Sequence, residues 1–288
     1  RHEGTVDFAF VGASLASDTD ADGRVDALAL PAPFTTSAAQ IPSGATLVEA
    51  TLYWGGTQID PGTPCTGTPD SDVTLESPDG AIHAVSADRC DCAEGGAAAY
   101  DVWTCVADVT ADLAAADLVG TWSVDDYTGL VAGGDTDHAA AGLLLVADHA
   151  GFAPRTVVVA DGLQTLSSSS TTVSFTGLTI AGPATGELGF LALEGDPGPS
   201  PAESVTIDAF PSGSAGAVSD GTSPADDPIN QTIGTTTGTI GIDLDRFDLS
   251  GRMADGDDQL DLIVGAWNYD EGGVDGTGGV FLISGALQ

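Results

Sequence analysis

Short runs of aliphatic, β-branched and aromatic residues recur along the chain, and Gly, Pro, Asp and Ser separate them. Residues 46–54 nearly alternate between apolar and polar positions, which predicts a strand with one face in water. Residues 143–146 (LLLV) and 157–159 (VVV) are continuously apolar, which predicts strands buried on both faces. Propensity and spacing together predict an all-β fold, a β-sandwich or jelly roll. Strands are expected at 46–54, 120–124, 142–147, 156–160, 171–180, 187–193, 204–210, 238–244, 259–264 and 279–284.

One segment favours a helix. Residues 108–117 are rich in Ala and carry an acid near their start, so they predict one short helix within the β fold. No break between domains is evident. The pattern therefore indicates a single β-sandwich domain over residues 18–288, with a cysteine-containing insertion near 60–105, preceded by a strand extension at 1–17.

The strand extension is amphipathic. Val6, Phe8 and Phe10 alternate with Asp7 and Ala9, as the residues of a strand do. An apolar strand near a chain end either pairs within its own sheet or fills the groove of a neighbouring subunit by strand addition. In the second case residues 1–17 are a donor strand. A head-to-tail contact of that kind does not close and so builds a fibre, with the chain itself as partner.

The composition is strongly acidic. The 288 residues carry a formal net charge of -37, and all six basic residues are Arg. The 42% of hydrophobic residues exclude a disordered acidic tail. A surface this acidic repels nucleic acid and anionic membranes, so no nucleic-acid partner is expected. No apolar run is long enough for a membrane span.

Four cysteines, Cys65, Cys90, Cys92 and Cys105, lie close together in the sequence. Their even number predicts two disulfides and an oxidising compartment. A four-cysteine zinc site is the alternative, but the C-x-C spacing differs from the paired C-x2-C of zinc ribbons. A direct bridge between Cys90 and Cys92 would be strained on extended chain. Each is therefore expected to pair with Cys65 or Cys105, in an order that the sequence leaves open.

An Asp-rich run resembles the first part of a calcium loop. Carboxylates stand at loop positions 1, 3, 5 and 9, a Gly stands at position 6, and a backbone carbonyl is expected at position 7. The bidentate Glu usual at position 12 is replaced by Ala29, so another ligand would have to come from elsewhere in the fold. Calcium is the predicted cofactor, and a solvated acidic turn is the alternative. The candidate ligands are Asp18, Asp20, Asp22, Arg24 and Asp26.

Several segments in order resemble one family. They include residues 41–56 (IPSGATLVEATLYWGG), 154–163 (PRTVVVADGL), 186–196 (GELGFLALEGD) and 241–249 (GIDLDRFDL). Together they resemble the uncharacterised β-rich domain of bacterial and archaeal cell-surface proteins, which often precedes Ig-like stalk repeats. The resemblance spans about residues 41–288. It implies an all-β fold at an extracellular location, and it supplies no catalytic residues.

The motifs of common enzymes are missing from the sequence. No G-x-S-x-G, H-E-x-x-H or phosphate-binding loop occurs, and the four His lack metal-ligand spacing. A non-enzymatic protein is therefore predicted. One N-glycosylation sequon begins at Asn230. Four Trp could stack on a sugar, although Trp in β-sandwiches usually belongs to the core: Trp54, Trp103, Trp122 and Trp267.

These features lead to two functional hypotheses. The first is a structural subunit of an extracellular filament or surface layer, assembled by β-strand addition and favoured by calcium, because cations screen the self-repulsion of a charge of -37. The second is a monomeric secreted adhesin or glycan-binding module with a polysaccharide partner. Arg rather than Met at the first position is what a processed, secreted chain would show, which agrees with a cell-surface location.

Overall fold

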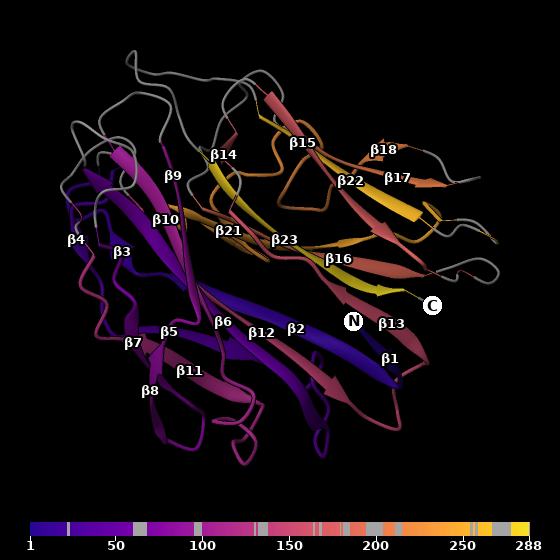
Figure 1. Cartoon of the computed structure of the whole chain (residues 1–288), viewed down its shortest axis with the longest axis horizontal. Coiled ribbons are helices and arrows are strands. Elements are labelled where there is room, and N and C mark those ends of the chain that lie inside the picture. Colours follow the sequence, from indigo (N-terminus) through magenta and orange to yellow (C-terminus); the bar gives the residue numbers. More distant parts are fainter. Residues whose placement is uncertain are drawn as a thin grey trace.

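The computed structural model describes residues 1–21, 24–59, 68–94, 100–129, 131, 138–163, 165–166, 169–178, 180, 185–193, 204–210, 215–253, 256, 259–266 and 278–287. Throughout this part of the chain the regular elements are β-strands, so the predicted all-β class is confirmed. Most strands belong to four sheets, numbered I to IV here in the order in which they stack (Figure 1).

Sheet I has the order β5 (Ala32–Thr36), β11 (Gly120–Asp125), β7 (Asp72–Glu76) and β8 (Ile82–Ser86). Sheet II has the order β2 (Val6–Ser14), β12 (Ala139–Asp148), β6 (Thr46–Ile59), β10 (Tyr100–Asp108) and β9 (Arg89–Glu94). Sheet III has the order β1 (His2–Gly4), β13 (Arg155–Val159), β23 (Gly278–Leu287), β16 (Gly186–Leu193), β21 (Ile242–Asp248), β19 (Thr232–Ile233) and β20 (Thr236–Thr237). β14 (Thr165–Leu166) also pairs with β23. Sheet IV has the order β15 (Ser169–Thr176), β22 (Gln259–Ala266), β17 (Ser204–Phe210) and β18 (Gly216–Ala217). β3 (Ala16–Ser17) and β4 (Ala27–Leu28) form a separate hairpin.

Three layers of buried side chains hold the four sheets together. Trp122 and Leu143 belong to the layer between sheets I and II. Leu144 and Leu191 belong to the layer between sheets II and III. Phe190 belongs to the layer between sheets III and IV. Because neighbouring residues of a strand point to opposite faces, β12 and β16 contribute to a layer on each side. The predicted burial of residues 143–146 on both faces is thereby confirmed, since all four are 0% exposed.

The predicted helix at 108–117 is wrong. Asp108 ends β10, and the turns that follow it are anchored to β6: the Val109 N–H donates to the Ala50 carbonyl (2.9 Å), and Thr110 Oγ1 accepts the Ala50 N–H (2.9 Å). Val109 and Leu113 are buried in the layer between sheets I and II. An isolated helix of this length is marginal in water, so these anchors outweigh its Ala content.

The described part of the predicted insertion near 60–105 supplies strands to two sheets. β7 and β8 belong to sheet I, whereas β9 and β10 belong to sheet II. Residues 60–67 lie outside the described part of the chain. No helix of the described residues is long and apolar enough to cross a membrane.

Candidate functional site

The acidic loop between β3 and β4 brings three carboxylates together. The two strands pair antiparallel, and the Asp26 N–H donates to the Ser17 carbonyl (2.9 Å), so the two ends of the loop are adjacent. Asp18, Asp20 and Asp26 each offer an oxygen, and these oxygens lie within 4.8 Å of one another. Carboxylate oxygens at this spacing can hold a metal ion.

Local hydrogen bonds shape this acidic loop. One Asp26 carboxylate oxygen accepts the N–H (2.8 Å) and the hydroxyl (2.7 Å) of Thr19, and these bonds lower the pKa of Asp26. Asp18 accepts the N–H groups of Asp20 (3.1 Å) and Ala21 (2.6 Å). Asp26 is therefore ionised at neutral pH, as a cation ligand must be. Of the other predicted ligands, Arg24 is exposed and Asp22 lies outside the described residues.

A second feature is the edge of β2 that faces away from β12. The Leu15 N–H donates to the Ala139 carbonyl (2.7 Å), and the His149 N–H donates to the Thr5 carbonyl (2.9 Å). Odd-numbered residues of β2 therefore bond to β12, because pairing residues alternate in an antiparallel ladder. The N–H and C=O groups of the even-numbered residues point to the other edge, where sheet II ends.

Charged side chains cap this edge at Phe8. Its N–H donates to Asp7 Oδ1 (2.9 Å), and its carbonyl accepts from Arg246 Nη1 (3.1 Å). The Arg246 guanidinium also lies 4.4 Å from the centre of the Phe8 ring and pairs with Glu187. Asp7 is held in turn by Arg155 (2.6 Å). Such caps prevent strand pairing at an exposed edge.

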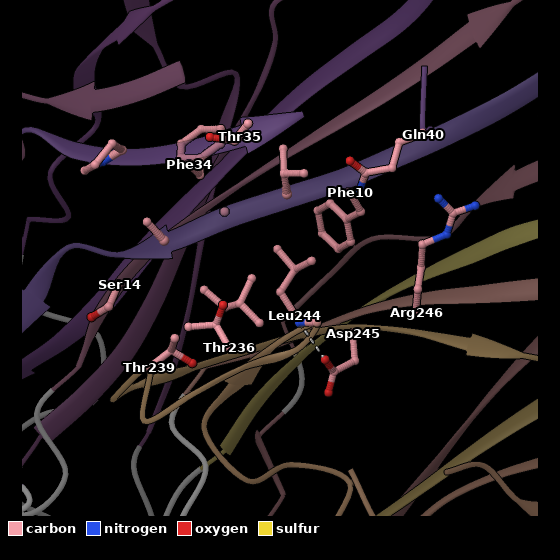
Figure 2. Close-up of a pocket in the computed structure, with 16 residues that line it drawn as sticks. Phe10, Ser14, Phe34, Thr35, Gln40, Thr236, Thr239, Leu244, Asp245 and Arg246 are labelled. Atoms are coloured by element: carbon pink, nitrogen blue, oxygen red, sulfur yellow. Dashed lines mark hydrogen bonds between the residues drawn. The ribbon is translucent and has the colours of Figure 1, made fainter. Parts of the chain in front are cut away.

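The cap does not extend to the second half of β2. Among the described residues, no strand or side chain takes the outward N–H and C=O groups of Phe10 and Gly12. These residues line a groove of about 480 Å³ instead. Residues 10–14 form one wall, and residues 33–35 with Gln40 form the second. The third wall comes from the β19–β20 hairpin and residues 244–246 (Figure 2).

Figure 2 shows how the side chains lie in this β2 groove. Ser14 and Arg246 mark its two ends, and Gln40 lies beside Phe10. Apolar surface from Phe10 and Leu244 is combined with hydroxyl and amide groups, so the groove offers both apolar contacts and hydrogen bonds. Its volume is in the range of pockets that take small ligands or short segments of chain.

Two buried carboxylates belong to β21: Asp245 contributes to the third wall of the groove, Asp243 precedes it, and neither stands in a sequence motif that predicts a site. Asp243 and Asp245 are 0% exposed, and as alternate residues of β21 they share one face. Burial raises the pKa of Asp243 to about 7 and that of Asp245 to about 6. Their only sequence signal is a D-x-D pattern within an apolar strand.

The structure places the predicted assembly residues inside their own domain. Val6, Phe8 and Phe10 lie in the layer between sheets II and III, at most 3% exposed. In the single chain, therefore, the strand pairs within its own sheet.

The predicted disulfide and glycan positions also have defined surroundings. Cys90 and Cys105 are directly opposite in the β9–β10 pair and form a disulfide. Cys92 is disulfide-bonded as well, and Cys65 lies outside the described residues. The Asn230 amide nitrogen, which would carry a glycan, donates to the Thr222 carbonyl (2.9 Å).

The described tryptophans belong to the core. Trp54, Trp103 and Trp122 are at most 3% exposed, so none presents a ring face to a sugar. Trp267 lies outside the described residues.

Fold and site together define an all-β protein with four stacked sheets, an acidic loop and an open strand edge. No family model matches the chain, and no curated protein matches it. One similar solved structure is the N-terminal CBM22-1–CBM22-2 tandem domain of Paenibacillus barcinonensis Xyn10C, at 11% identity and a TM-score of 0.23, covering 98% of this chain and 91% of that one. Another is the insecticidal δ-endotoxin Cry8Ea1 of Bacillus thuringiensis, at 9% identity and a TM-score of 0.25, covering 100% of this chain and 53% of that one. Scores this low do not define a shared fold.

Proposed function

We propose that the chain is a non-enzymatic extracellular structural protein, a filament or layer subunit that joins copies of itself by β-strand addition. The observation that carries this proposal is the uncapped edge of β2 at Phe10 and Gly12, which lines the β2 groove. An extended segment of a neighbouring copy would pair with these backbone groups, and the pocket beside them would take its side chains.

The placement of residues 1–17 refines how such an assembly would form. Because β2 already fills a place in its own core, its role in strand addition is to supply the accepting edge. An exchange of residues 1–17 between copies would reproduce the contacts seen here and remains a second route to the same polymer.

Calcium has a clear role in this proposal. Copies with a net charge of -37 repel one another at low ionic strength, so bound and screening cations favour assembly. The Asp18–Asp20–Asp26 group is the proposed calcium site. The extracellular location rests on the disulfides and on the family resemblance, since disulfides persist in oxidising compartments.

The test uses one substitution that fills the groove and one that does not. Thr35 lines the groove from β5, and its cross-strand partner on β11 is Thr121, which is also exposed. We expect Thr35→Trp to abolish filaments that the unmodified protein forms in calcium or high salt, and Thr121→Trp to leave them intact. Electron microscopy and sedimentation measure both. Single particles of the unmodified protein under every condition, or normal filaments from Thr35→Trp, would refute the proposal.

A glycan-binding module is the second candidate, because the groove also presents the hydroxyl and amide groups of Thr35, Gln40 and Thr236. A glycan array on the same proteins tests it. Binding that Thr35→Trp removes and Thr121→Trp keeps, without any filaments, would favour this alternative.

A further inference from the structure

Four side-chain oxygens lie close together where the β19–β20 hairpin meets β21. They belong to Ser223, Asn230, Thr232 and Asp245. Thr232 Oγ1 lies 2.9 Å from Asp245 Oδ2, 2.9 Å from Asn230 Oδ1 and 3.1 Å from Ser223 Oγ. Ser223 Oγ lies 2.7 Å from Asp245 Oδ2. Contacts this short between oxygens are attractive only where a hydrogen lies between them.

The three contacts of 2.9 Å or less need three hydrogens, whereas the two hydroxyls supply only two. Each hydroxyl has a single hydrogen, and a carboxylate has none. If Ser223 donates to Asp245, the Thr232 hydroxyl can serve either Asp245 or Asn230, but not both. The other 2.9 Å contact would then join two oxygens that both carry lone pairs.

A proton on Asp245 Oδ2 completes the network. Asp245 then donates to Thr232 Oγ1, and Thr232 donates to Asn230 Oδ1. The Asn230 side chain is held in the orientation that this chain needs, because its Nδ2 donates to the Thr222 carbonyl (2.9 Å). Each of the three contacts of 2.9 Å or less then has one hydrogen, and only the longer Ser223–Thr232 contact (3.1 Å) has none.

The neighbouring Asp243 adds to the need for positive charge. Its Oδ1 accepts the N–H groups of Asn230 (2.7 Å) and Thr232 (2.9 Å), whereas its buried Oδ2 has no hydrogen-bond partner. Two buried carboxylates on one strand face repel each other, and ionising both carries a large desolvation cost.

Among the described residues, the groups near the pair do not balance this charge. Asp220, from the segment after β18, is the charged group that acts on Asp245, and it is another acid. β16 contributes apolar partners opposite both acids. His138 lies beside Gly241, where the chain enters β21. Arg246, the next residue of β21, makes its ion pairs with Asp7 and Glu187.

We infer that the Asp243–Asp245 pair holds one proton at neutral pH, and that losing this proton loosens the β19–β20 hairpin. The hairpin depends on the pair directly, because the Gly234 N–H donates to Asp245 Oδ1 (3.0 Å) and Thr232 bonds to both acids. Ile233 and Thr236 of the same hairpin line the groove. Protonation of the pair thus controls how firmly the hairpin is held in the groove wall. Only its effect on assembly rests on the proposed function.

The direction of the pH effect follows from linkage. Burial raises both pKa values from 3.8, to about 7 for Asp243 and about 6 for Asp245. Between pH 3.8 and these raised pKa values, the folded state binds more protons than the unfolded state. The stability that the pair contributes is fully present below about pH 4 and is lost as the pH rises through 6 to 7.

The first measurement titrates the unmodified monomer by carboxyl-carbon NMR. We expect one of the two acids to remain protonated at pH 6 or above. Chemical shifts showing both acids ionised from pH 5 upward would overturn the inference. This titration needs neither a variant nor an assembled filament, so its outcome tests the inference independently of the proposed function.

The second measurement is hydrogen exchange of the hairpin amides between pH 4 and 9. Protection should fall by up to about tenfold per pH unit between about pH 4 and 7 and level off above, because in that window the opened hairpin releases a proton that the closed hairpin keeps. Asp245→Asn carries an amide that can donate to Thr232 at every pH, so its protection should change less with pH, and Asp243 accounts for the change that remains. Asp112→Asn, which removes one exposed acid elsewhere, should behave like the unmodified protein.

Two outcomes of the exchange experiment would contradict the inference that the proton holds the hairpin. In the first, Asp245→Asn follows the same pH profile as the unmodified protein. In the second, added Ca²⁺ or Na⁺ restores full protection at pH 8 while both acids are ionised, so that a metal ion supplies the missing positive charge.

Discussion

Arg246 is the residue whose removal should reveal how the free edge of β2 is fastened to sheet III. It donates to the Phe8 carbonyl, lies over the Phe8 ring and pairs with Asp7 (3.6 Å) and Glu187. The Arg246→Ala variant loses all of these contacts and leaves the Phe8 carbonyl without its partner.

The magnitude follows from the exposure of each contact. The charge-assisted hydrogen bond to the Phe8 carbonyl contributes about 1.5–3 kcal/mol. The cation–π contact adds about 1 kcal/mol. The Glu187 side chain is 40% exposed, so that ion pair adds about 0–1 kcal/mol. Because these terms share one side chain they do not simply add, and we expect a total loss of about 3 kcal/mol.

Arg89 provides the matched control. It also pairs with two acids, Asp91 and Asp161, but its side chain is 44% exposed. Arg89→Ala should therefore cost less than about 1 kcal/mol. Urea unfolding with the disulfides intact, followed by the fluorescence of the buried Trp, measures both variants. Equal losses in the two variants would refute the assignment of Arg246 as the fastening residue.

Three further predictions concern other parts of the molecule. A Cβ at Gly12 would lie 2.3 Å from a β12 carbonyl oxygen, so Gly12→Ala should lower the free energy of unfolding in urea by about 2–4 kcal/mol. Gly142→Ala, whose nearest contact is 3.3 Å, should lower it less. Replacing Cys90 and Cys105 by Ser opens a loop with a sequence separation of 15 and should lower unfolding stability by about 3 kcal/mol, whereas an unchanged midpoint would contradict this. Asp26→Asn should weaken Tb³⁺ luminescence and the rise in Tm with calcium, and luminescence equal to that of the unmodified protein would exclude Asp26 as a ligand.

The sequence located the longer strands of sheets III and IV because strand patterns are local, but it missed β5, β7, β8, β9 and β10. Residues 187–193 and 204–210 were predicted as strands and lie within β16 and β17. The acidic loop could also be predicted from the sequence, because its carboxylates follow one another within nine residues. The helix prediction failed at 108–117 because its anchors on β6 are distant in the sequence.

The sequence did not show which strand edges stay unpaired and which strand faces become covered in the tertiary structure. Asp7 alternates with apolar residues as a solvated residue would, yet Arg155 from sheet III reaches across to hold it. The uncapped edge of β2 exists because sheet II ends there, which depends on how distant strands pair.

The buried acids show the same limit most clearly. Residues 242–245 alternate Ile-Asp-Leu-Asp, which by itself indicates a strand with its acids in water. The segment around Ser223 and the β19–β20 hairpin cover that face instead, and both acids become fully buried. The sequence alone determined the all-β class, the positions of about half of the strands and the acidic loop, since these depend on neighbouring residues. The four-layer stack, the open groove and the buried acid pair were decided by contacts between segments far apart in the chain, which no local pattern records.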